Sequence, residues 1–254
     1  MSTLITRTYG QEMCRAIKAE LSKLCSLPIT WFTLGGTFIV NLILAYAFSN
    51  AGLQGLTSMQ STLEIGLASV SYAQAGLMIF GILTVCSEYN GGQIRTTLTA
   101  MPRRGIQIFA ALFALTVVLI PAAFVVSSSG VLLTQILLGD AGAPIVWANL
   151  VSAMLGVSAY LTLTGLISAA IGVVLRRMLP ALAIMLGYYF IAGPLIRDQA
   201  DFAKYLPDTA GVVMWFPQPD HARALTPVQG GILLGAWALA AIIIAATVYR
   251  KRDV

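Results

Sequence analysis

The chain has 254 residues, of which 58% are hydrophobic and only 10% are charged, and its net charge is +5. An average globular protein has about 25% charged residues, so this composition excludes a soluble protein and a disordered one. It indicates an all-α integral membrane protein. The positive charge does not indicate nucleic-acid binding, because the basic residues stand in short clusters between long apolar runs, as in the loops of membrane proteins.

Six apolar runs are long enough to cross about 30 Å of hydrocarbon as helices, which takes about 20 residues. None of them contains Lys, Arg, Asp or Glu. We expect spans at Thr30–Phe48, Gly66–Cys86, Ile106–Leu133, Val146–Leu175, Leu179–Ile196 and Val228–Tyr249. They form one transmembrane domain, residues 30–254, behind a cytoplasmic segment, residues 1–29.

The orientation follows from the basic residues on alternate sides of these runs. Twelve of the fifteen Lys and Arg residues fall on the side that holds both termini. The sequence therefore predicts six spans with both termini in the cytoplasm. The first 25 residues lack an apolar core with a cleavage site, so no signal peptide is expected. Asn-x-Ser/Thr motifs are absent, which fits a multi-pass protein of a bacterial plasma membrane.

The N-terminal segment Gln11–Cys25 is amphipathic. Its apolar residues recur at helical spacing: Met13, Ile17, Leu21 and Leu24. Basic residues fall on the opposite face, which suits a helix in the inner headgroup layer that turns into the membrane at Pro28, an elbow. Glu20 lies beside the apolar stripe. It either extends to water or pairs with a basic residue of a partner or of the next loop.

The loop after the second span, residues 87–105, is the most informative segment. Gly91-Gly92 permits a sharp backbone break, and residues 93–101 then read as a short helix that Pro102 ends. Ile94 and Leu98 share one face of that helix. Such a helix can dock into a groove on a cytoplasmic protein, or the segment is an ordinary basic loop. The residue pattern alone leaves both interpretations open.

The run Glu-Tyr-x-x-Gly-x-Ile-Arg-Thr-Thr-Leu-x-x-x-Pro-Arg-Arg begins at Glu88. It resembles the loop between the second and third spans in permease subunits of type-2 ATP-binding-cassette (ABC) exporters, where the loop carries the coupling helix that contacts the ATPase. The resemblance implies that the ATPase-coupling residues are Glu88, Gly92, Ile94, Arg95, Thr97, Leu98 and Pro102. It also implies that Glu88 accepts from a basic residue on the ATPase or on the elbow helix.

The topology resembles the same family over the whole chain. That resemblance implies a membrane-spanning subunit that exports a substrate, forms a homodimer or pairs with a similar permease, and binds cytoplasmic ABC ATPase subunits. We expect an amphipathic substrate, because the spans offer no charge. ATP and Mg would bind in the partner, with no cofactor in this chain.

The residues themselves favour neither catalysis nor metal binding. The chain has no phosphate-binding loop and no paired carboxylates within a span, so we expect no enzyme activity of its own. His221 is the one histidine and stands on the opposite side from the cysteines, so we expect no metal site. The rival interpretation is a stand-alone membrane facilitator or assembly scaffold without an ATPase partner.

A few polar residues lie inside the apolar runs, where each needs a hydrogen-bond partner. Residues that could line a substrate path are Asn41, Gln74, Tyr160 and Trp237. Hydrogen bonding between helices is the alternative explanation for such residues. The long outer segment, residues 197–227, reads as two short helices, the second of which places Trp215 at the membrane interface. In the family that the chain resembles, short helices at this position cap the exit path, and the resemblance implies the same role here.

Overall fold

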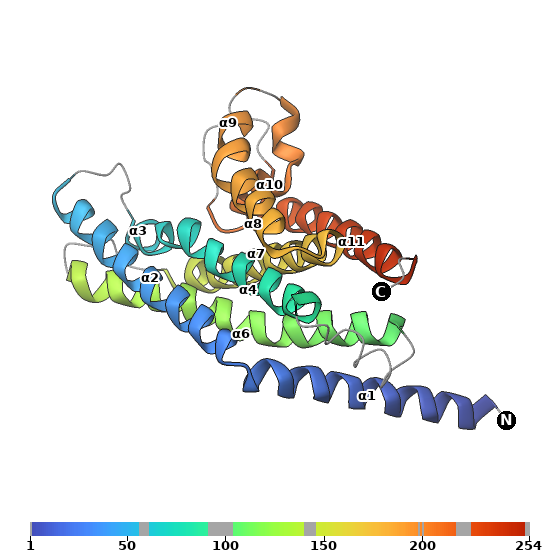
Figure 1. Ribbon diagram of the computed structural model, residues 1–254. Helices are drawn as coiled ribbons and strands as arrows, with labels where there is room; N and C mark the ends of the chain where they lie inside the picture. Colours follow the sequence, from blue (N-terminus) through green and yellow to red (C-terminus); the bar gives the residue numbers. More distant parts are fainter. Residues whose placement is uncertain are drawn as a thin grey trace.

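The computed structural model describes residues 2–55, 61–90, 104–139, 146–197, 199, 201–216 and 225–251. Every regular element within these residues is helical (Figure 1). The α-helices are α1 Ser2–Ser26, α2 Pro28–Leu53, α3 Thr62–Ala68, α4 Val70–Asn90, α6 Arg104–Leu138, α7 Trp147–Leu175, α8 Met178–Gly187, α9 Gly193–Arg197, α10 Pro207–Val213 and α11 Pro227–Lys251. A π-helical turn, η2, covers Tyr188–Ala192, and a 3-10 helix, η3, covers Asp201–Tyr205.

Six helical segments are long and apolar enough to cross a membrane. They are Pro28–Leu53, Thr62–Tyr89, Gly105–Leu138, Trp147–Leu175, Met178–Arg197 and Pro227–Lys251. Each contains most or all of one run expected from the sequence, so the six-helix expectation is confirmed. The second segment joins α3 to α4, and the fifth joins α8, η2 and α9. Helices satisfy their own backbone polar groups, which is why such segments can lie in hydrocarbon, and the six together indicate a multi-pass membrane protein.

The two chain ends lie toward the same end of the molecule, together with the end of α4 and the start of α6 (Figure 1). An even number of crossings produces this arrangement. The break expected at Pro28 is present: Leu27 is extended (φ −76°, ψ 123°), and Pro28 opens α2. The helix before the break is longer than the expected Gln11–Cys25, since α1 begins at Ser2.

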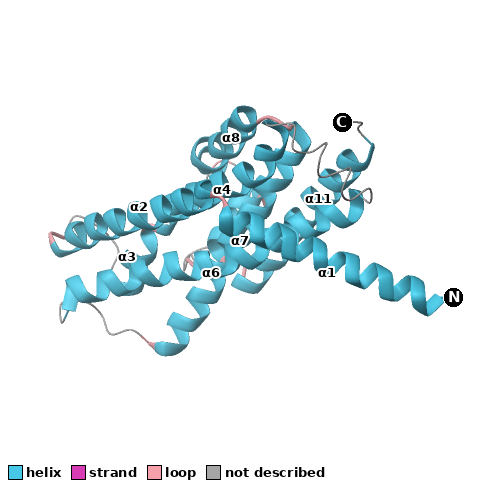
Figure 2. Cartoon of the chain, turned by 60° about the horizontal axis from the view of Figure 1, so that its bottom comes forward, coloured by secondary structure: helices cyan, strands magenta, loops and turns pink. Residues whose placement is uncertain are grey.

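The core is built around α7, which lies in the middle of the helices in both views (Figures 1 and 2). Much of its length is buried, and it packs against α4, α6 and α11. It approaches α4 closely at Gly81, where a Cβ atom would lie 2.4 Å from the carbonyl oxygen of Gly165. Small residues at such a crossing let the two backbones meet, as in other membrane helix pairs.

The first helix, α1, packs along the beginning of α6. Ala16 of α1 and Ile106 and Ala110 of α6 are buried together, and Met13 and Ile17 pack beside them. Met13 and Ile17 belong to the apolar stripe seen in the sequence, so that stripe faces protein at this point. This packing holds α1 beside the end of α4, where the charged residues described next meet.

Candidate functional site

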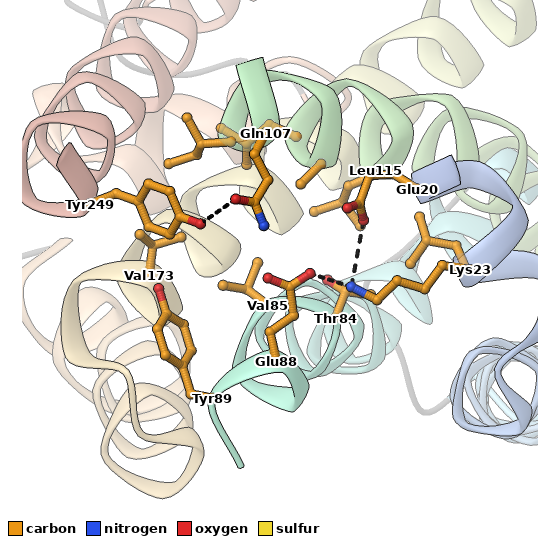
Figure 3. Close-up of a pocket in the computed structure, with 14 residues that line it drawn as sticks. Glu20, Lys23, Thr84, Val85, Glu88, Tyr89, Gln107, Leu115, Val173 and Tyr249 are labelled. Atoms are coloured by element: carbon orange, nitrogen blue, oxygen red, sulfur yellow. Dashed lines mark hydrogen bonds and ion pairs between the residues drawn. The ribbon is translucent and has the colours of Figure 1, made fainter. Parts of the chain in front are cut away.

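Three charged side chains meet where α1 passes the end of α4 (Figure 3). Lys23 donates a hydrogen bond to Glu88 Oε1, and its Nζ lies 3.5 Å from Glu20 Oε2. Glu20 and Lys23 are three residues apart on α1, whereas Glu88 belongs to the last turn of α4. We call these three residues the Lys23 cluster. Their side chains are 27% exposed for Lys23, 13% for Glu20 and 12% for Glu88, so the charges are largely withdrawn from water.

Burial and neighbouring charges shift the pKa values of Glu20 and Lys23. Burial raises the pKa of Glu20 above its ordinary value of 4.5; the attraction of Lys23 opposes the rise, and the nearby charge of Glu88 adds to it. Burial acts to lower the pKa of Lys23, but the charges and hydrogen bonds of Glu88 and Glu20 outweigh it, and that pKa is raised. Lys23 is therefore an ammonium ion at neutral pH, and it joins two carboxylates on two helices.

A small cavity adjoins the Lys23 cluster and takes its walls from α1, α4, α6, α7 and α11 (Figure 3). On its far side Tyr249 Oη donates a hydrogen bond to Gln107 Oε1 at 2.9 Å. The volume is about 40 Å³. A water molecule needs about 10–15 Å³ on this measure, so there is space for a few waters and not for an amphipathic substrate. The cluster therefore holds helices together rather than binding cargo.

Arg176 contacts the same end of α4. It caps α7 with a left-handed backbone (φ 54°), and its guanidinium carbon lies 5.5 Å from the ring centre of Tyr89. Such cation–π contacts stabilise by about 0.5–2 kcal/mol, depending on exposure. The signal in the sequence was available, because Tyr89 and Arg176 end two spans that terminate on the same side.

The structure places one of the expected ATPase-coupling residues, Glu88, and leaves the rest undetermined. Gly92, Ile94, Arg95, Thr97, Leu98 and Pro102 lie outside the described residues, so their role stays a prediction. For Glu20 the sequence left two alternatives, exposure to water or a basic partner elsewhere. In the structure its partner is Lys23 of its own helix, with Glu88 on the far side of that ammonium group.

Two of the four candidate path residues come together. Tyr160 Oη of α7 donates a hydrogen bond to Gln74 Oε1 of α4, and both residues line a cavity of about 240 Å³. Other walls of this cavity come from η2, α9 and α10. We call it the Arg197 cavity, after the charged residue at the end of α9 that lines it.

The other two path residues lie elsewhere. Asn41 is fully buried: its Nδ2 donates to the carbonyl oxygen of Val126 at 2.8 Å, and its Oδ1 accepts from Ser69 at 2.8 Å. These bonds join α2 to α6 and to the junction of α3 and α4. Trp237 is 45% exposed and donates to the carbonyl oxygen of Tyr205 at 2.9 Å. Neither residue lines the Arg197 cavity.

In the described part of the outer segment, the short helices η3 and α10 are followed by a turn that carries Trp215. Trp215 is 5% exposed, and its expected depth at the membrane interface stays a prediction. Its ring centre lies 6.2 Å from that of Tyr160 and 5.8 Å from that of Phe216. A second cavity of about 420 Å³ lies beside this turn, between Phe216 and Glu64. The turn therefore packs against α7.

Among the described residues, no group of three or more His, Cys, Asp or Glu could hold a metal ion. His221 lies outside those residues. A scan against protein-family models and a search of curated proteins found no match. The function is therefore argued from the geometry of the Lys23 cluster, the Arg197 cavity and the loop pattern.

Proposed function

We propose that the chain is the membrane-spanning subunit of an ABC exporter, which moves an amphipathic substrate outward with ATP hydrolysed by a separate cytoplasmic subunit. The observation that carries the proposal is the ion pair between Lys23 and Glu88. It ties α1 to α4 immediately before the segment whose pattern resembles a coupling loop. Glu88 is three residues from Gly91, so a displacement of that loop would be transmitted to the ion pair through the last turn of α4.

The Lys23 cluster suits the transmission of force. Exposed ion pairs contribute about 0–1 kcal/mol, whereas breaking a buried pair costs about 3–5 kcal/mol. The partial burial here puts the Lys23 cluster between these limits. When ATP draws two ATPase subunits together, displacement of the loop would move α4 and α1 as one body, and the packing of α1 on α6 would extend the motion to the third span.

The proposal includes an orientation. The end of the molecule that holds the termini and the Lys23 cluster faces the cytoplasm, because twelve of the fifteen Lys and Arg residues fall on that side. In a bacterial plasma membrane α1 then lies at the inner headgroup layer as an elbow helix. Two permease subunits, identical or similar, enclose the substrate path, and ATP with Mg binds only in the partner ATPase.

A stand-alone facilitator or assembly scaffold would have the same six spans. Such a protein needs no docking helix, however, and the apolar residues Ile94 and Leu98 would then cost solubility on a cytoplasmic loop without a compensating contact. The two functions therefore differ in whether the loop binds an ATPase, and the experiment tests that binding.

The test compares Leu98→Asp with Thr99→Asp, which adds the same charge to the neighbouring position on the more polar face of the expected helix. Each tagged variant is expressed with the genes that adjoin its own, purified in mild detergent, and analysed for ATPase subunits per chain. Burial of a leucine contributes about 1.5–3 kcal/mol, so Leu98→Asp should weaken ATPase binding by about tenfold or more. Thr99→Asp should retain it.

Size analysis provides the control for folding, since both variants should still insert and dimerise. Full retention of the ATPase by Leu98→Asp would show that the loop is not the docking element.

A further inference from the structure

The Arg197 cavity has a composition unlike that of the rest of the apolar spans. Residues in its walls include Tyr72, Gln74, Tyr160, Phe190, Arg197 and Asp208. It thus combines aromatic rings with one cation and one anion at the end of the fifth apolar segment. The expected spans contain no charged residue, so this pair was not expected beside Gln74 and Tyr160.

The carboxylate of Asp208 is buried and has several hydrogen-bond donors around it. It is 1% exposed, and it accepts hydrogen bonds from Tyr188 Oη at 2.9 Å, from Arg197 Nη2 at 3.3 Å and from Thr209 Oγ1 at 3.4 Å. The backbone of α9 approaches it so closely that a Cβ atom on Gly193 would lie 2.4 Å from its Oδ2. If Arg197 turned away, the carboxylate would still keep two donors.

Arg197 differs from Asp208, because the described residues leave most of its hydrogen-bonding capacity unused. A guanidinium group has five N–H donors, and the described residues provide one hydrogen bond to it, the long contact with Asp208. Its Nε is buried and has no hydrogen-bond partner there. The side chain is 27% exposed. A cation with spare donors beside an open volume is suited to an anionic group, which it can meet with two parallel hydrogen bonds.

The other walls fit an apolar chain. Tyr72 is 51% exposed at the edge of the cavity, and its ring centre lies 6.5 Å from that of Phe190. Gln74 is occupied by Tyr160 and by the carbonyl oxygen of Ser71, to which its Nε2 donates at 2.7 Å. On the measure used for the smaller cavity, about 10–15 Å³ for each water, the cavity of about 240 Å³ has space for an acidic head and its first few carbons. The remaining chain can pass Tyr72 into hydrocarbon.

We propose that the Arg197 cavity binds the anionic head of an amphipathic ligand, a carboxylate or phosphate on an apolar chain, with Arg197 as the anion-binding residue. Asp208 competes with the ligand for the guanidinium group. The head takes over donors of Arg197 that now face Asp208, and this weakens the link between α9 and α10. That the ligand is exported cargo rests on the proposed function, whereas its binding does not.

The binding test uses the purified chain without any ATPase, in nanodiscs of phosphatidylcholine. Equilibrium dialysis measures radiolabelled decanoate and, as the uncharged probe of equal chain length, decanol, with empty nanodiscs subtracted. Hydrogen bonds to charged groups contribute about 1.5–3 kcal/mol, so decanoate should bind saturably and about tenfold or more tightly than decanol. Equal binding of the two probes would overturn the proposal.

Variants separate anion binding from a purely structural ion pair. Arg197→Gln should weaken decanoate binding by about tenfold or more and leave decanol unchanged, whereas Asp208→Asn should strengthen decanoate binding because it removes the competing charge. The matched control is Lys204→Gln, which makes the same charge change on η3, where the ammonium group lies over Tyr205, and should change neither probe. Equal weakening of both probes by Arg197→Gln and Asp208→Asn would show that the pair only holds the fold.

A second set of nanodiscs, containing phosphatidylglycerol, shows whether the anionic head belongs to a membrane lipid or to a free amphiphile. If lipid occupies the cavity, decanoate is displaced, and native mass analysis finds phosphatidylglycerol retained by the wild type and lost from Arg197→Gln. If decanoate binding is unaffected, the ligand is a free amphiphile. Both results support the anion site, and phosphatidylglycerol retained equally by Arg197→Gln would contradict it. Neither depends on the Leu98→Asp experiment, so either proposal can fail alone.

Discussion

The Lys23 cluster and the Arg197 cavity both contain an ion pair. They differ in the number of hydrogen-bond donors that have no partner among the described residues, and in the volume of the cavity beside the pair. In the Lys23 cluster one ammonium group meets two carboxylates, and about 40 Å³ remains. In the Arg197 cavity a guanidinium group with spare donors faces about 240 Å³. Fourteen residues separate Gln74 from Glu88 on α4, about 21 Å by helical rise. The difference indicates that saturated charges in a packed site hold helices together, whereas an unsaturated charge beside open volume binds a ligand.

The largest expected effect tests the first half of this comparison. Lys23→Met leaves two carboxylates, Glu20 and Glu88, facing each other without a cation. We expect the free energy of unfolding to fall by about 3 kcal/mol, the lower end of the range for broken buried pairs, because the site is partly exposed. Thermal unfolding of the detergent-purified chain measures the loss.

The matched control is Lys18→Met, which removes an exposed cation from the same helix. It should change the unfolding midpoint little. Equal losses in Lys18→Met and Lys23→Met would mean that the Lys23 cluster contributes no more than a surface charge, and the comparison would fail at that end.

A smaller effect separates structural hydrogen bonds from the ligand cavity. Asn41→Ala removes two donor bonds and one acceptor bond between helices, and interhelical bonds of this kind contribute on average about 0.6 kcal/mol each. The unfolding midpoint should fall while decanoate affinity stays the same. Gln74→Ala should instead change that affinity by a few fold, since Tyr160 loses its acceptor at the cavity wall. Loss of decanoate binding in Asn41→Ala would show that the hydrogen bonds of Asn41 and the Arg197 cavity are coupled, contrary to this account.

The smallest effect concerns pH. Because the pKa of Glu20 is raised in the folded chain, its contribution to stability is fully present below the ordinary value of 4.5 and is lost as pH rises through the folded value. Glu20→Gln is uncharged throughout. Relative to this variant the wild type should lose stability as pH rises above about 4.5, as followed by the difference in unfolding midpoints. A difference that stays constant across this range would show that Glu20 is not desolvated.

The six spans could be predicted because charge is costly in hydrocarbon, so the absence of Lys, Arg, Asp and Glu marks each span. The break before α2 was also visible, since Pro28 has no N–H to donate and fixes its own φ. The partner of Glu88 could not be chosen from the sequence, because it depends on how α1 rotates against α6. Asn41 and Gln74 look alike in sequence, because each is a lone amide in an apolar run. Only their tertiary partners show that Asn41 joins helices and that Gln74 lines a cavity.

The Arg197 cavity was beyond prediction for a local reason. The fifth span contains a π-helical turn, Tyr188–Ala192, and the wider turn changes the register of every residue that follows it. Helical periodicity could therefore not place Arg197 relative to Tyr188. The contact with Asp208 also depends on the short helix α10, whose docking no periodicity in the sequence indicates.

The central claim is that an ATPase partner drives this chain through the loop that follows Glu88. Native mass spectrometry tests it most directly, on the complex purified in mild detergent from cells that express the chain with its adjoining genes. The account predicts an assembly of two permease subunits and two ATPase subunits that hydrolyses ATP. Recovery of the chain alone, or of a permease dimer without ATPase under conditions that preserve the dimer, would contradict it.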